Sequence, residues 1–199
     1  MGKLEQIGLE ILNTSLLEWN AVLSSVFYIV LIARKNSLAW FFALVGSSIY
    51  VYLCFISQFY LETILQLFYV SMAIIGWLLW NKKQEIPFKI IQWKGKQHLV
   101  NILISSILTL ILGNFFQVYT DQALPYLDAF TTVFSISATL MVAFKVLENW
   151  LYWIVIDIAS MPLYAYRDLN LTVVLFGIYT IVAIVGFVRW RRTFKLQAQ

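Results

Sequence analysis

Seven long apolar stretches, separated by short polar connections, dominate the sequence. They run over residues 16–33, 37–56, 60–80, 98–112, 127–147, 150–166 and 169–190. About 20 apolar residues in a helix cross the roughly 30 Å hydrocarbon core of a bilayer, because a helix satisfies its own backbone hydrogen bonds where water is absent. Charged residues make up only 12% of the chain, against about 25% in a typical soluble domain. The sequence therefore predicts seven transmembrane helices, of which 98–112 is the shortest.

The positive charges predict the orientation of these helices. Lys and Arg accumulate on the cytoplasmic side of membrane proteins. Seven spans with the N-terminus outside put twelve of the fourteen Lys and Arg residues on that side, and only Lys3 and Arg167 fall outside. We therefore expect an N-out, C-in topology. The net charge of +4 follows from this asymmetry, so membrane lipid is an expected partner and nucleic acid is not.

An internal repeat predicts how the helices are grouped. The segment from Trp40 to Trp80 aligns without a gap on the segment from Trp150 to Trp190, 110 residues later. Ten of the 41 positions are identical, and those least explained by apolar composition are Trp40/Trp150, Tyr69/Tyr179, Gly76/Gly186 and Trp80/Trp190. Two three-helix repeats share one orientation only if a single helix intervenes, and the fourth stretch supplies it. Parallel repeats of this kind occur in transporters, with the substrate near the midplane between the halves.

These features divide the chain into segments and give its fold class. We expect an N-terminal amphipathic segment at 1–15, a first three-helix repeat at 16–80 and a cytoplasmic loop at 81–97. A linker helix and outer loop follow at 98–126, then a second three-helix repeat at 127–190 and a basic cytoplasmic tail at 191–199. The predicted fold is an all-α membrane protein with 3+1+3 parallel repeats of three-helix bundles.

Asp157 is the charged residue that most needs an explanation. It lies in the middle of the sixth stretch, where a carboxylate costs about 2.5–3.5 kcal/mol unless it is paired or hydrated. Trp153 and Trp150 precede it by four and seven residues, so two indoles lie on the same helix face below the carboxylate. Aromatic rings with a counter-charge bind flat cations. The alternatives are a structural hydrogen bond or a protonated acid for Asp157, and interfacial anchoring for the two tryptophans.

Polar and aromatic residues also gather on one face of the third stretch. Glu62, Gln66 and Tyr69 are spaced by four and three residues, so they project from the same side of a helix. That face can hydrogen-bond and stack, although an interfacial charge explains Glu62 equally well. Trp77, near the inner end, is either a site residue or an interfacial anchor. In the sixth stretch, Pro162 predicts a kink, which makes it a candidate hinge.

The sequence lacks the residues of most catalytic and metal sites. Cys54 is the single cysteine and His98 the single histidine, so there is no His/Cys cluster for a metal and no thiol pair. No Gly-rich phosphate-binding loop occurs. Asp157 and Glu62 lack the nucleophile or metal that a hydrolytic site needs. We expect no metal, no cofactor and no enzymatic activity.

Two stretches resemble the PnuC-type vitamin transporters of bacterial inner membranes. The first is Leu65-Gln66-Leu67-Phe68-Tyr69 followed by Gly76-Trp77 and Trp80, and the second is Glu148-Asn149-Trp150-Leu151-Tyr152-Trp153-Ile154 with Asp157. The resemblance implies a SWEET-like fold and facilitated diffusion of a vitamin precursor, chiefly nicotinamide riboside, which a cytoplasmic kinase traps by phosphorylation. By position, it implies substrate contacts from Gln66, Tyr69, Trp153 and Asp157, with Trp77 and Trp150 as further candidates.

Several alternatives stay open at this point. Thiamine also presents a flat cationic ring, and where some members carry an Asn in the second helix this chain has Gly46, Ser47 and Ser48, so thiamine is an alternative substrate. A membrane scaffold subunit is a more remote alternative. Proton coupling through Asp157 is open, as is a homo-oligomeric state. An ion channel is disfavoured, because the spans show no ring of polar residues at one level.

Overall fold

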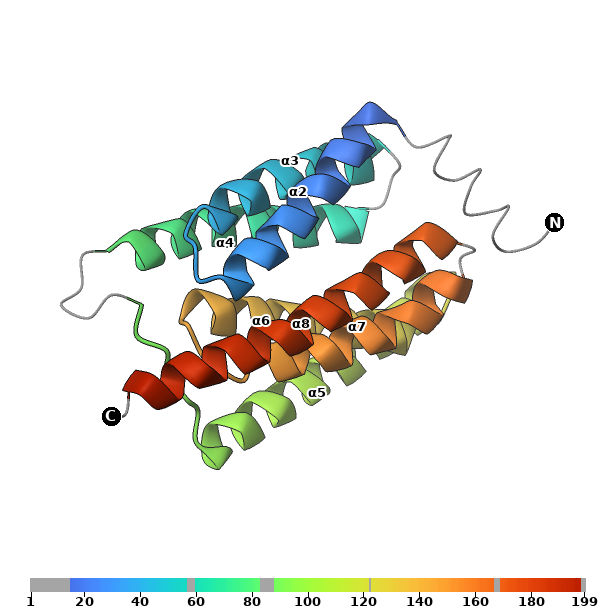
Figure 1. Ribbon diagram of the computed structural model, residues 1–199. Coiled ribbons are helices and arrows are strands. Elements are labelled where there is room, and N and C mark those ends of the chain that lie inside the picture. The colour runs from blue at the N-terminus through green and yellow to red at the C-terminus, as the bar shows by residue number, and fades with distance from the viewer. Residues whose placement is uncertain (1–14, 57–59, 83–87, 122, 167–168, 198–199) are drawn as a thin grey trace.

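A computed structural model describes residues 15–56, 60–82, 88–121, 123–166 and 169–197. Its described residues form seven helices: α2 (Leu16–Ala33), α3 (Ala39–Ile56), α4 (Tyr60–Asn81), α5 (Gly95–Tyr119), α6 (Pro125–Ala143), α7 (Asn149–Tyr166) and α8 (Asn170–Gln197) (Figure 1). Each corresponds to one of the predicted stretches. Except for Ser15, the predicted amphipathic segment 1–15 lies outside the described residues.

Three of the predicted boundaries are wrong. α5 is not the short helix of 98–112 but has 25 residues, because the polar residues at its two ends continue the helix; the Gln97 side chain caps its start by accepting from the Lys94 amide at 2.8 Å. The fifth stretch ends at Ala143 and not at 147, where Lys145 takes a left-handed conformation with φ 60°. α8 continues to Gln197 through most of the predicted tail, since Arg, Lys and Leu favour helix.

Six of the seven described helices are long and apolar enough to cross a membrane, and α7 is the exception. It has 18 residues, which span about 27 Å at 1.5 Å per residue, so its length suffices. Its apolarity falls short because it carries Asn149, Asp157 and several Trp and Tyr residues. α7 packs against α6 and α8, so the least apolar span is covered by the rest of the bundle.

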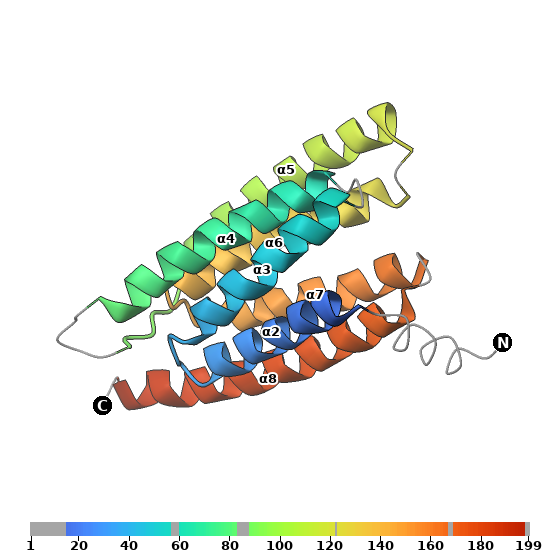
Figure 2. The ribbon, with the colours of Figure 1, turned by 90° about the horizontal axis from the view of Figure 1, so that it is seen from above.

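The helices form two groups of three. α3 packs against α2 and α4, and α7 packs against α6 and α8, while α5 packs against α6. The groups meet where α2 contacts α8 and α4 contacts α6. Figures 1 and 2 show the two groups side by side, with α5 outside the second group. The predicted 3+1+3 arrangement is confirmed.

Four tryptophans, Trp40, Trp80, Trp150 and Trp190, form the centre of the main buried core and are called the tryptophan cluster here. The Trp40 and Trp80 rings lie 5.5 Å apart at 88°, and their repeat equivalents Trp150 and Trp190 lie 5.5 Å apart at 86°. Trp80 and Trp190 approach each other at 6.1 Å. The repeat in the sequence is therefore a repeat of packing geometry.

Hydrogen bonds of the same cluster join the two groups reciprocally. The Trp80 indole N–H donates to the Ala143 carbonyl of α6 at 3.1 Å. The Trp190 indole N–H donates to the Ile32 carbonyl of α2 at 3.2 Å. Each third helix thus binds the end of the first helix of the other repeat, which ties the two groups together at the end where α4 and α8 finish.

Two glycines of the repeat make room for the tryptophan cluster, which leads to a prediction. A Cβ added at Gly186 would lie 2.7 Å from the buried Trp150 ring, and one at Gly76 would overlap the Trp40 ring. We expect Gly186→Ala to lower the free energy of unfolding by about 1–3 kcal/mol, as overpacking of a core does. Thermal unfolding in detergent measures the loss.

Gly177 is the matched control, because a Cβ added there meets nothing within 4 Å. Gly177→Ala should keep or slightly raise the melting temperature, since Ala favours helix over Gly by up to about 1 kcal/mol. Equal melting temperatures for Gly186→Ala and the unsubstituted protein would contradict the packing role of Gly186.

Candidate functional site

Asp157 lies in the middle of α7 and is only 1% exposed. Its Oδ2 atom has no hydrogen-bond partner among the residues that the structure describes. A carboxylate in the interior of a membrane protein is costly unless a charge or several hydrogen bonds compensate it. Asp157 is therefore a buried acceptor that a bound cation or hydrogen-bond donor would satisfy.

Two tyrosine–serine pairs connect the repeats near Asp157. Tyr69 of α4 hydrogen-bonds with Ser135 of α6, and Tyr179 of α8 hydrogen-bonds with Ser25 of α2. The pairs are equivalent, because both members differ by 110 residues. Both tyrosines also interact electrostatically with Asp157. The carboxylate thus faces hydroxyl groups from both halves of the molecule.

Ser25 shows which partner donates in one of these pairs. Its hydroxyl donates to the Ala21 carbonyl within α2 at 3.0 Å. A serine hydroxyl has a single proton, so Ser25 accepts from the Tyr179 hydroxyl. The Tyr179 ring is in this way held between its own helix and the neighbouring repeat.

Aromatic rings surround this polar centre. Tyr164 of α7 stacks on Phe176 of α8 with centroids 5.1 Å apart at 22°, and Phe176 meets Tyr179 edge-on at 5.8 Å. Trp153, one helical turn before Asp157, is half-buried and packs against both buried core clusters. The combination of a carboxylate, phenolic hydroxyls and ring faces suits a flat, positively charged ligand.

The predicted site residues fall into two groups in the structure. Tyr69, Trp153 and Asp157 belong to the region just described, and Gln66 is half-buried on α4 one turn before Tyr69. Glu62 is half-buried in the first turn of α4, where it interacts electrostatically with Cys54 of α3. Glu62 is therefore placed toward the end of the first repeat.

The structure places three other candidates away from Asp157. Trp77 is 40% exposed and lies on the outward side of α4. Trp150 is 1% exposed and packs within the tryptophan cluster, about 10 Å along the α7 axis from Asp157 at 1.5 Å per residue. Pro162 is exposed, and α7 continues as a helix through it.

Some residues of this region were not found from the sequence. Tyr179, Ser25 and Ser135 were not selected, although the repeat offset that pairs Tyr179 with Tyr69 could have found all three. Tyr164 and Phe176 carry no such signal, because one of many aromatic residues in an apolar chain does not stand out. Among the described residues, no group of three or more His, Cys, Asp and Glu side chains could hold a metal ion.

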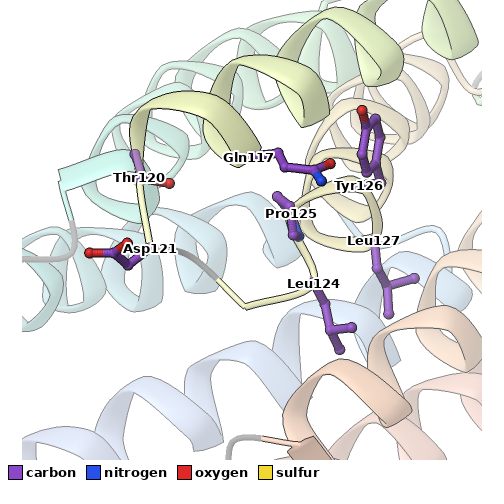
Figure 3. Close-up of a pocket in the computed structure, with 7 residues that line it drawn as sticks. All are labelled: Gln117, Thr120, Asp121, Leu124, Pro125, Tyr126 and Leu127. Atoms are coloured by element: carbon purple, nitrogen blue, oxygen red, sulfur yellow. The ribbon is translucent and has the colours of Figure 1, made fainter.

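A shallow depression lies elsewhere, at the turn between α5 and α6 (Figure 3). It is lined by Gln117, Thr120, Asp121, Leu124, Pro125, Tyr126 and Leu127. None of these is a predicted site residue, and the depression is open to the surface. We therefore place the candidate site around Asp157 and not here.

Comparison with known proteins gives consistent matches. The family model described as nicotinamide mononucleotide transporter matches residues 15–192. The nicotinamide riboside transporter PnuC of Neisseria mucosa is 24% identical over 190 residues, covering 88% of this chain and 72% of the relative. The protein of the same name in Escherichia coli is 25% identical over 179 residues, covering 76% of this chain and 74% of the relative.

A solved structure is also similar. The crystal structure of the vitamin B3 transporter PnuC superposes with a TM-score of 0.76 at 23% sequence identity. The match covers 97% of this chain and 90% of that chain. At this identity the likeness concerns the fold, and it confirms the expected arrangement of helices.

Proposed function

Because the chain belongs to the nicotinamide mononucleotide transporter family, we propose that it carries nicotinamide riboside across the membrane. The resemblance to PnuC-type transporters is confirmed by the family match and by the relatives of that name. The chain is a multi-pass membrane protein and its family consists of transporters, so the expectation that it is not an enzyme holds. The scaffold alternative has no support among these relatives.

The observation that carries this proposal is the buried carboxylate of Asp157 with an unpartnered oxygen. Nicotinamide riboside has a positively charged pyridinium ring. A charge of that kind offsets the cost of the buried carboxylate, because opposite charges attract strongly where water is excluded. The site lies between the two repeats, which is where parallel-repeat transporters hold their substrates.

The other predicted residues receive complementary roles. Trp153 offers a ring face for stacking on the pyridinium. Gln66 and Tyr69 supply an amide and a hydroxyl for the carboxamide or the ribose hydroxyls. Glu62 is proposed at the predicted outer end of the path, Trp77 and Trp150 as further candidates, and Pro162 as the hinge of α7.

The distribution of positive charge favours the riboside over its phosphorylated form. The helices carry Lys and Arg only near their predicted cytoplasmic ends, with Lys96 in the first turn of α5 and Arg189, Arg191, Arg192 and Lys195 late in α8. A bound phosphate needs Lys, Arg or clustered backbone N–H groups. The region around Asp157 supplies a negative charge instead, which repels a phosphate.

The names of the relatives also favour nicotinamide riboside over thiamine, because both relatives described above are nicotinamide riboside transporters. We propose facilitated diffusion in a bacterial inner membrane, with the N-terminus outside and trapping by a cytoplasmic kinase. Uptake should then persist when the membrane potential and the proton gradient are collapsed.

Thermal stabilisation of the detergent-purified protein tests this function. Ligands that bind the folded state alone raise its stability by mass action, by about 2.7 kcal/mol at a hundredfold excess over Kd. Nicotinamide riboside should raise the melting temperature, while nicotinamide mononucleotide and riboflavin should not. A shift with thiamine alone would move the assignment to thiamine, and no shift with any of these ligands would contradict the proposal.

A further inference from the structure

Phe88 occupies an unusual position at the end of the molecule where α4 and α8 finish. Its ring meets Trp80 of the first repeat edge-on at 4.6 Å and Trp190 of the second repeat edge-on at 5.4 Å. Its backbone is left-handed, with φ 56°, which is unfavourable for a bulky residue. Such a conformation persists only where surrounding contacts hold it.

The contacts that hold Phe88 come from the second repeat. The Lys145 ammonium lies 5.0 Å from the centre of its ring. The Gln197 side chain donates to the Phe88 carbonyl at 3.0 Å and accepts from the Ile90 amide at 3.2 Å. Phe88 is thereby fixed to the turn after α6 and to the end of α8.

The residues after Phe88 continue this attachment, and residues 88–94 are called the strap here. Ile91 forms a parallel bridge with Val146, in which the Ile91 amide donates to the Lys145 carbonyl at 3.1 Å and the Leu147 amide donates to the Ile91 carbonyl at 2.8 Å. The Trp93 amide donates to a Glu148 carboxylate oxygen at 3.2 Å. The strap is bound to one repeat, and its Phe88 ring presses on the other.

This arrangement closes one end of the molecule. The tryptophan cluster fills the space between the ends of α4 and α8, and Phe88 contacts Trp80 and Trp190 where the two repeats meet. Substrate held near Asp157 can leave toward this end only if the repeats separate here. By the predicted topology, this is the cytoplasmic end.

We propose that the strap is the cytoplasmic gate of the transporter and that Phe88 is its plug. Opening withdraws the Phe88 ring from between Trp80 and Trp190 and releases the strap from the turn at residues 144–148. This role rests on the proposed transport function, since it assigns the step in which substrate is released. It does not depend on which ligand is carried.

Thiol labelling tests the plug without a substrate. Cys54→Ala removes the native thiol, and Ala143→Cys places one at a buried position, 1% exposed, whose carbonyl accepts from Trp80. In inside-out vesicles, Phe88→Ala should raise the rate of labelling by an impermeant maleimide about tenfold, because loss of the plug raises the open population. Phe144→Ala is the control, since that ring is 56% exposed on the neighbouring turn. Equal labelling rates in the two variants would overturn the proposal.

A reversible cross-link tests the gate during transport. Bridge partners in a parallel pair lie close enough for a disulfide, so Ile91→Cys with Val146→Cys, in the Cys54→Ala background, can lock the strap. The oxidised protein should still be stabilised by nicotinamide riboside but lose uptake, and dithiothreitol should restore it. Uptake by the oxidised protein at the reduced rate would overturn the gate.

A control pair and the labelling result separate the gate from the proposed function. Asn101→Cys with Ser137→Cys links α5 to α6, where the Ser137 hydroxyl donates to the Asn101 side chain at 2.8 Å, and its oxidation should leave uptake intact. If the carried ligand is assigned wrongly, the reduced protein fails to take up nicotinamide riboside, yet the labelling difference between the Phe88 and Phe144 variants remains.

Discussion

Asp157→Asn is expected to abolish nicotinamide riboside uptake while the protein still folds. The substitution keeps the shape of the side chain and removes its charge, so the cationic ring loses its counter-charge in a site 1% exposed to solvent. Leaving one partner of a buried ion pair uncompensated costs about 3–5 kcal/mol, which corresponds to at least about a hundredfold in affinity. Uptake into proteoliposomes and thermal stabilisation by the ligand measure the two losses.

A matched variant and a clear alternative make this prediction specific. Asp121→Asn removes a carboxylate that is exposed after the end of α5, and it should leave uptake unchanged. If Asp157 is a protonated acid with a structural role, its amide replacement preserves hydrogen bonding and uptake continues. Parental uptake by Asp157→Asn would therefore support the structural explanation against the counter-charge.

Trp190→Ala is expected to cause the largest loss of stability of any single substitution proposed here. Trp190 is fully buried, contacts Trp150 and Trp80, and donates its indole N–H to the Ile32 carbonyl. Removing a buried Trp side chain costs about 3–5 kcal/mol. Van der Waals packing of this kind is a main source of association between membrane helices. The melting temperature in detergent should fall accordingly.

Two comparisons show whether packing or the hydrogen bond matters more. Trp190→Phe keeps an aromatic ring but removes the N–H donor, and the loss should be near 1 kcal/mol for a single hydrogen bond. Trp77→Ala removes a tryptophan that is 40% exposed and should change stability least. A larger effect from Trp77→Ala than from Trp190→Ala would contradict the assignment of the core.

The two tryptophans at positions 77 and 150 show where reasoning from the sequence stopped. Both lie near helix ends, and their positions allow a binding role or an interfacial role. The structure places Trp77 on the outward side and Trp150 in the core. Trp153, only three residues after Trp150, lies a turn closer to Asp157. A few residues of difference along a helix thus separate packing from a candidate contact with substrate.

The boundaries of α5 and α8 illustrate a second limit. Hydropathy detects the part of a helix that lies in lipid, and it underestimated α5, whose ends carry polar residues that do not break the helix. For the same reason α8 continues into a basic segment that was expected to be a tail. A helix ends where its backbone bonds stop, and the apolar stretch can end earlier.

The sequence by itself determined the number of spans, the 3+1+3 grouping and the importance of Asp157. These follow from local quantities: apolar length, the repeat offset of 110 residues, and the cost of a charge in lipid. Only the tertiary structure decided which side chains meet. Tyr179 contacts Ser25, Trp190 bonds to Ile32, and Phe88 lies between Trp80 and Trp190. These partners lie on different helices or beyond them, and their meeting depends on how whole helices are rotated and packed, which no local pattern encodes.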